Sequence, residues 1–309
     1  MRKWAAFWLL GLIWGSSFLF IRIGVEQLSP FQVVFIRTGI AAVGLNLVLL
    51  ARGKHLPFNG KALLPLVIIA IGNTTIPFAL ITWGEKSITS GLAAMLQSAA
   101  SLFTLVIAHF VFIDERMTPQ KVVGLLVGFI GVMVLGSRSI VNGQLDVPQF
   151  LGAMAVVLAS LFYAIFSIYS RKVIQNRFEP MMVSTGAMTF AAISSGILMV
   201  IAPLLGGQPA TPLSNVSSDV LVAIGLLGLV NTFIAYLLYY WIIRELGAAR
   251  TSMVTYITPA VGLALGAVVL QEQVDWRLLV GAALIFCGIA IVNLRVFNRI
   301  TFRRATEKV

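Results

Sequence analysis

The sequence predicts an all-α membrane protein in which ten transmembrane helices form two inverted-topology five-helix repeats around a central cavity. Three observations predict this fold: the amount of apolar sequence, the uneven distribution of basic residues among the loops, and a repeat between the two halves of the chain. They bear, in that order, on the class of protein, its orientation and its symmetry.

The composition of the 309 residues is that of a protein surrounded by lipid. Hydrophobic residues make up 59% of the chain and charged residues 11%, with a mean hydropathy of +0.97. Soluble domains are about 45–50% apolar and about 25% charged. A water-soluble enzyme of this composition would expose many apolar side chains, so that class is excluded. A secreted disulfide scaffold is also excluded, because Cys287 is the only cysteine.

The net charge of +11 does not indicate a nucleic-acid-binding protein. The charges lie in short breaks between apolar segments, and no basic face of a soluble domain is present. Arg2 and Lys3 precede a first apolar segment that lacks a small-x-small cleavage site, so we interpret it as a retained helix. The largest basic cluster lies near the C-terminus and contains Arg295, Arg299, Arg303, Arg304 and Lys308.

Ten apolar segments are separated by charges, prolines or glycine clusters. Each approaches the roughly 20 residues that a helix needs to cross about 30 Å of hydrocarbon. The links are short, and the longest is the proline- and glycine-containing stretch 203–218, so no extramembrane domain is predicted. The predicted helices cover 4–24, 31–51, 63–84, 89–112, 119–137, 148–170, 180–203, 219–243, 248–270 and 276–297.

The basic residues of the loops fall mainly on one side of the membrane. With the N-terminus in the cytoplasm, 17 Lys and Arg lie in cytoplasmic segments and four in outer segments, while Arg37 lies within a helix. Cytoplasmic loops carry an excess of Lys and Arg. We therefore expect a multi-pass protein of the cell (inner) membrane with both termini in the cytoplasm and a basic tail at 301–309.

The second half of the chain repeats the first at a nearly constant offset. Asn73-Thr74 recurs as Asn231-Thr232 at an offset of 158 residues. At an offset of 157 residues, a glutamate is followed in both halves by two glycines at the same spacing. Each half, predicted as 1–140 and 141–300, contains five helices. Since five is odd, the second half enters the membrane from the opposite side, as in many transporters whose substrate site lies at the repeat interface. The matched triplets are Glu115, Gly124, Gly131 and Glu272, Gly281, Gly288.

These repeated residues occur together with Trp14-Gly15 in the first helix, Arg37 and Ala41-Ala42 in the second, Gly128 in the fifth and Pro259 in the ninth. Their order and doubling resemble a ten-span member of the drug/metabolite transporter superfamily with two EamA domains. The resemblance covers nearly the whole chain. It implies export of amino acids or other small metabolites through a central cavity open to one side at a time. One departure is that Arg37 has no basic counterpart in the seventh helix.

Arg37 is the one charge well inside a predicted helix, about 9 Å deep at 1.5 Å per residue. Ionisable groups inside a membrane are functional candidates, so Arg37 is interpreted as an anchor for a substrate carboxylate or as an ion-pair partner of Glu85. The structural alternative is a side chain that snorkels to the interface. All 11 acidic residues lie at helix ends or in loops. We therefore expect transport to respond weakly to an imposed pH gradient.

Polar and aromatic side chains in the apolar helices are the other candidates for the cavity wall. Gln97, Ser101 and Thr104 share one helical face, and Thr255 is the repeat counterpart of Gln97. Helix packing and an interfacial aromatic belt are the structural alternatives. The predicted substrate-binding residues are Trp14, Arg37, Asn73, Thr74, Gln97, Ser101, Tyr163, Asn231, Thr232, Tyr236, Thr255 and Tyr256.

The function favoured by this pattern is a secondary transporter that exports small metabolites, with amino acids as the class implied by the resemblance. Multidrug or cation efflux and a sugar or nucleotide-sugar carrier are the alternatives within transport. An intramembrane enzyme is disfavoured, because no aspartate lies well inside a predicted helix and neither Gly-x-Ser-Gly nor His-Glu-x-x-His occurs. No cofactor or metal is predicted. The expected partners are a small-molecule substrate and the lipid bilayer, without nucleic acid, and the protein is expected to be a monomer.

Overall fold

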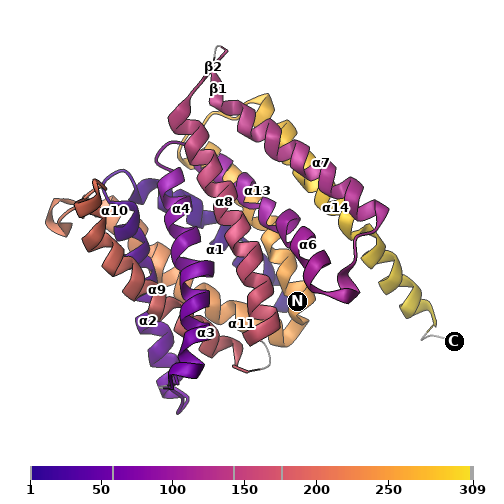
Figure 1. Ribbon diagram of the computed structural model, residues 1–309, viewed down its shortest axis with the longest axis horizontal. Helices are drawn as coiled ribbons and strands as arrows, with labels where there is room; N and C mark the ends of the chain where they lie inside the picture. Colours follow the sequence, from indigo (N-terminus) through magenta and orange to yellow (C-terminus); the bar gives the residue numbers. More distant parts are fainter. Residues whose placement is uncertain (1, 58, 142, 175–176, 307–309) are drawn as a thin grey trace.

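The computed structural model describes residues 2–57, 59–141, 143–174 and 177–306, which are nearly all helical (Figure 1). Within those residues, nine helical segments are long and apolar enough to cross a membrane, and a shorter apolar helix, Trp276–Val292, follows them. These nine segments and the helix that begins at Trp276 lie close to the ten positions predicted for helices. Residues 307–309 of the predicted tail lie outside the described residues. The nine segments are Arg2–Gly24, Pro30–Ala51, Gly60–Gly84, Ser90–Val111, Pro119–Ser139, Val147–Lys172, Pro180–Leu205, Ser218–Leu246 and Ser252–Val269.

Several of these segments consist of more than one helix. The third segment contains α3 (Gly60–Ala70) and α4 (Ile76–Gly84), and the eighth contains α10 (Ser218–Gly228) and α11 (Ala235–Leu246). The other helices are α1 (Arg2–Gly24), α2 (Pro30–Ala51), α5 (Ser90–Gln97), α6 (Ala99–Val111), α7 (Pro119–Gly136), α8 (Val147–Tyr169), α9 (Pro180–Ile201), α12 (Ala248–Thr251), α13 (Ile257–Val269) and α14 (Trp276–Thr306). Two short strands, β1 (Ile140–Val141) and β2 (Gln144–Leu145), pair antiparallel.

Local sequence signals start several of these helices. The Ser29, Thr118 and Asp146 side chains each accept a backbone N–H from the first turn of the helix that follows them. Each of these caps is followed within two residues by a proline in the first turn, where its missing N–H is not needed. These caps explain why the helix starts lie close to those predicted.

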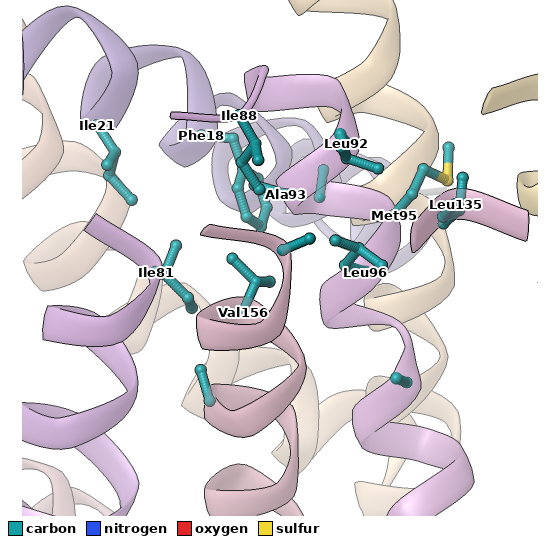
Figure 2. Close-up of a cluster of buried hydrophobic side chains, with 14 of the residues drawn as sticks. Phe18, Ile21, Ile81, Ile88, Leu92, Ala93, Met95, Leu96, Leu135 and Val156 are labelled. Atoms are coloured by element: carbon teal, nitrogen blue, oxygen red, sulfur yellow. The ribbon is translucent and has the colours of Figure 1, made fainter. Parts of the chain in front are cut away.

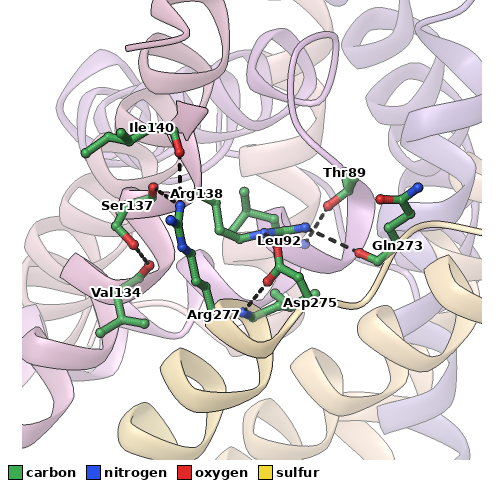
Figure 3. Close-up of polar contacts among 10 residues, drawn as sticks. Thr89, Leu92, Val134, Ser137, Arg138, Ile140, Gln273, Asp275 and Arg277 are labelled. Carbon is green, nitrogen blue, oxygen red and sulfur yellow. Dashed lines mark hydrogen bonds and ion pairs between the residues drawn. The ribbon is translucent and has the colours of Figure 1, made fainter. Parts of the chain in front are cut away.

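The loops gather at two ends of the bundle. One end carries the β1–β2 hairpin and is called the hairpin end; the hairpin projects at the top of Figure 1. There the Arg138 Nε donates to the Asp275 Oδ2 at 2.8 Å, and the Arg277 Nη1 donates to the carbonyls of Ser137 and Ile140 (Figure 3). The opposite end carries two ion pairs, Lys54 with Glu179 and Arg171 with Glu115.

Both copies of the duplicated Asn-Thr pair lie in a π-helical turn. Asn73 and Thr74 belong to the turn Ile71–Thr75 between α3 and α4, and Asn231 and Thr232 belong to the turn Leu229–Ile234 between α10 and α11. π-helical turns are rare and occur often at functional sites. The two turns interrupt the two segments at matching positions of the repeat.

Glycines bring α7 and α14 into close contact, and the two helices run antiparallel beside the rest of the bundle (Figure 1). A Cβ at Gly124 would lie 2.6 Å from the Gly288 carbonyl oxygen, and a Cβ at Gly131 would lie 2.7 Å from that of Gly281. Gly124 therefore packs on Gly288, which is the repeat counterpart of Gly131. In the same way, Gly131 packs on Gly281, which is the repeat counterpart of Gly124. Such close backbone approach is the use that membrane proteins make of small residues.

A buried apolar cluster fills the hairpin end between α1, α4, α5 and α8. Its residues interdigitate, and Figure 2 shows Ile81 and Val156 facing Phe18 and Ile88 across the cluster. Phe18, Ile21 and Ile81 are each 3% exposed, and Ile88 is 2% exposed. This cluster separates the interior of the bundle from the loops of the hairpin end.

Candidate functional site

A cavity of about 560 Å³ lies inside the bundle. Its volume is within the range of about 300–1,000 Å³ that small-molecule sites occupy. Thr74 and Thr232 are buried beside the cavity and do not line it. The other predicted site residues do line it: Trp14, Arg37, Asn73, Gln97, Ser101, Tyr163, Asn231, Tyr236, Thr255 and Tyr256.

The cavity opens toward the end opposite the hairpin. Its lining residues Ser167, Ser252 and Thr255, which lie toward that end, are exposed. Phe18 and Ile81, which line it toward the hairpin end, are buried in the apolar cluster of Figure 2. The protein is therefore in a conformation with one end of the cavity closed.

Arg37 points into the bundle, and its residue is 8% exposed. Its Nε donates to the Thr232 Oγ1 at 2.9 Å, and its Cζ lies 3.9 Å from the centroid of the Phe78 ring. The side chain thus packs on an aromatic face inside the protein instead of snorkelling to the interface. No ion pair with Glu85 forms, because both carboxylate oxygens of Glu85 are without a hydrogen-bond partner.

The two duplicated asparagines differ in their contacts. The Asn231 Nδ2 donates to the Ile13 carbonyl, to the Ser16 Oγ at 2.8 Å and to the Ser17 Oγ at 3.3 Å. Since a carbonyl can only accept, the amide nitrogen must face α1, which leaves the Oδ1 without a donor. The Oδ1 of Asn73 is also buried without a donor. Both oxygens are therefore buried acceptors without a donor, in residues that line the cavity.

Aromatic rings form one side of the cavity. The Trp14 and Tyr236 ring centroids lie 6.5 Å apart, and Trp14 lies 5.3 Å from Tyr239. Trp83 and Trp241 do not line the cavity and are 45% and 39% exposed, as an interfacial belt requires. Tyr239 packs on Trp14 and does not line the cavity, so depth in a helix alone does not place an aromatic ring at the cavity wall.

Sequence reasoning missed part of the cavity wall. Phe18, Phe78 and Phe286 line the cavity, but phenylalanine in an apolar helix gives no signal that distinguishes a cavity from lipid. Ser98 also lines it, at the break between α5 and α6. Its position next to Gln97 was the available signal. Thr251, one helical turn before Thr255, does not line the cavity: it is fully buried and donates to the Gly247 carbonyl.

The charge of the cavity wall is positive. Arg37 is the one charged residue among the described residues that line it. Among the described residues, no group of three or more His, Cys, Asp or Glu is placed to hold a metal ion. The wall therefore offers a guanidinium, amide and hydroxyl groups and aromatic faces to a ligand.

Comparison with known proteins agrees with this arrangement. A model of the EamA-like transporter family matches residues 3–137 and again residues 150–294. The chain belongs to the EamA-like transporter family. It is a multi-pass membrane protein of this transporter family, and the two matched ranges cover most of the chain.

Relatives within the family carry transporter names. An uncharacterized transporter of Archaeoglobus fulgidus is 28% identical over 294 residues, covering 94% of this chain and 99% of the relative. The uncharacterized inner membrane transporter YedA of Escherichia coli is 30% identical over 265 residues, covering 84% and 80%. A probable amino-acid metabolite efflux pump of Escherichia coli is 27% identical over 290 residues, covering 92% of each chain.

A solved protein structure has the same fold. Its TM-score with this EamA-family chain is 0.65 at 21% sequence identity, and the alignment covers 95% of this chain and 96% of the other. At this identity the match supports the fold alone.

Proposed function

We propose that this EamA-family protein is a secondary transporter that exports amino acids from the cell by alternating access. The observation that carries the proposal is the cavity wall, in which Arg37 is buried among aromatic rings and two asparagine oxygens have no donor. A guanidinium binds a carboxylate with paired hydrogen bonds. In the proposed complex the side-chain oxygens of Gln97 and Ser101, which line the cavity, accept hydrogen bonds from an ammonium, and the rings of Trp14 and Tyr236 pack against an apolar side chain.

Cation efflux is less well supported by this wall. A permanent cation is stabilised by a carboxylate or by aromatic faces, and no carboxylate lines the cavity among the described residues. The buried Arg37 repels a cation. The name of the Escherichia coli relative, a probable amino-acid metabolite efflux pump, favours the same substrate class.

Alternating access is the proposed mechanism because the cavity is closed at the hairpin end and open at the other. The reciprocal glycine contacts of α7 and α14 support an inverted repeat, since a two-fold axis in the membrane plane makes matched helices antiparallel. In the proposed orientation both termini are cytoplasmic and the hairpin end is outside. The structure then corresponds to the inward-open state, ready to receive a cytoplasmic substrate.

The proposal is tested by counterflow of radiolabelled phenylalanine in liposomes that contain the purified protein. We expect exchange of phenylalanine but not of phenethylamine, which lacks the carboxylate. Arg37→Gln should reduce the apparent affinity about 10- to 100-fold, as expected for loss of about 1.5–3 kcal/mol from a hydrogen bond to a charged group. Arg37→Lys should retain part of the affinity.

Lys86→Gln is the matched control, because Lys86 lies at the hairpin end, outside the cavity, and its Nζ bonds to Gln208. It should exchange phenylalanine like the wild type. Equal exchange of phenethylamine and phenylalanine would contradict the carboxylate anchor. If no amino acid of any side-chain class exchanged, the proposed substrate class would be wrong.

A further inference from the structure

Glu85 is a fully buried acidic residue that the proposed substrate site does not use. It directly follows α4, one turn beyond the cavity-lining Ile81, at the closed hairpin end. The residue is 0% exposed, and neither carboxylate oxygen has a hydrogen-bond partner. Burial without donors costs an ionised carboxylate far more free energy than it costs the neutral acid.

The charged groups around Glu85 are occupied elsewhere. The Arg22 Nη1 donates to the backbone carbonyl of Glu85 and not to its carboxylate. Arg37 bonds to Thr232 and packs on Phe78, and the Nζ of Lys86 bonds to Gln208. None of the three cations forms a contact with the Glu85 carboxylate.

Glu272 is the second acidic group near Glu85, and both of its carboxylate oxygens are hydrogen-bonded. Its two carboxylate oxygens accept the backbone N–H groups of Ser90 and Gly91 at 2.7 and 3.0 Å. The like charge of Glu272 opposes ionisation of Glu85. Burial first, and then Glu272, therefore raise the pKa of Glu85 well above its usual range, against the opposing effects of Arg22 and Arg37.

Close helix contact keeps water away from this position. A Cβ at Gly84 would lie 2.7 Å from the Gly152 carbonyl oxygen of α8, and a Cβ at Gly152 would lie 2.9 Å from that of Gly84. The face of α8 that packs here presents Gly152 and Val156, which carry no charge. The Ile81 and Ile88 side chains belong to the apolar cluster of Figure 2.

We propose that Glu85 is a proton-binding site that keeps the hairpin end of the bundle closed. In the closed state the side chain is a neutral carboxylic acid. When the hairpin end opens, water reaches the carboxyl group and the proton leaves to the same side. Because the proton enters and leaves at one face, it is not carried across the membrane. The pH at that face then controls closure without driving transport.

The sign of the pH dependence follows from this scheme. Closing takes up a proton at every pH between the usual glutamate pKa of about 4.3 and the raised pKa of the closed state. Across that range, raising the pH favours the open state by up to about tenfold per pH unit. Below and above that range the equilibrium does not change with pH.

The test uses an Ile88→Cys reporter in a Cys287→Ser background, because Cys287 is exposed and Ile88 is buried in the closed cluster. In the purified full-length protein, thiol labelling of this reporter should accelerate as the pH rises, after correction for the thiolate fraction. Addition of Glu85→Gln, a permanently neutral side chain of similar shape, should keep labelling slow at every pH. Glu26→Gln is the matched control, because Glu26 is an exposed acid of the same end.

An infrared difference spectrum between wild type and Glu85→Gln gives a second readout that does not depend on the reporter. It should contain the carbonyl band of a protonated carboxylic acid at neutral pH. Absence of that band, or an unchanged pH dependence of labelling in Glu85→Gln, would overturn the proposal. The inference rests on the proposed function in one respect: alternating access requires a second state in which the hairpin end is open. Neither measurement uses a substrate, so a failure here leaves the counterflow result standing.

Discussion

At the residue scale, the two duplicated asparagines are predicted to have separable roles. The Asn231 side chain donates to three groups of α1, whereas the Asn73 Oδ1 is buried without a donor. Asn231→Ala should therefore lower the free energy of unfolding by about 1–2 kcal/mol, the value of an interhelical hydrogen bond in a membrane. Asn73→Ala should leave the melting temperature unchanged and reduce counterflow.

Thermal melting and counterflow of the two variants, measured side by side in the same detergent and liposomes, check this difference. Equal loss of stability in both variants would contradict it and would indicate that Asn73 also braces the helices. Retained counterflow with Asn73→Ala would remove that residue from the substrate site.

The candidate site was predictable from sequence where a polar or aromatic group stands out in an apolar helix. Arg37, Gln97 and Asn231 were found in this way because a bilayer offers no water to such groups. Burial of a residue at a helix end could not be predicted in this way, because the three-dimensional neighbours of a loop residue do not follow from its position in sequence. Glu85 was therefore counted with the loop acids, although Gly84 and Gly152 bring two helices together around it.

At the element scale, the contact of α7 with α14 is predicted to depend on glycine. Gly124→Ala should lower the free energy of unfolding by about 1–3 kcal/mol, the usual effect of overpacking, because its Cβ would meet the Gly288 carbonyl at 2.6 Å. Gly136→Ala is the control in the same helix, since nothing lies within 4 Å of its Cβ. Thermal unfolding in detergent should show loss of stability for the first variant only. A larger effect of Gly136→Ala would contradict the packing account.

Helix positions were well predicted from sequence, and interruptions within helices were not. Length, capping residues and prolines mark the ends of α2, α7 and α8. Pro77, in the first turn of α4, marks the π-helical turn at Asn73, whereas neither a proline nor a capping side chain marks the equivalent turn at Asn231 or the break at Ser98. Ser160 donates to the carbonyls of Leu96 and Gln97 at the break.

At the scale of the whole molecule, the arrangement combines a positively charged central cavity with one closed and one open end. The apolar cluster and the buried Glu85 lie at the closed end, and Ser252 and Thr255 lie at the open end. The alternation of basic loops predicts that the open end faces the cytoplasm. An inward-open cavity is the state from which an exporter takes up its substrate.

Sided cysteine labelling tests this central claim most directly. Gln144→Cys in the hairpin and Thr255→Cys in the cavity, each in a Cys287→Ser background, report on opposite ends of the bundle. With an impermeant thiol reagent, intact cells should label Gln144→Cys only, and inside-out vesicles should label Thr255→Cys only. Labelling of both positions from the same side, or of Thr255→Cys from outside alone, would contradict the account.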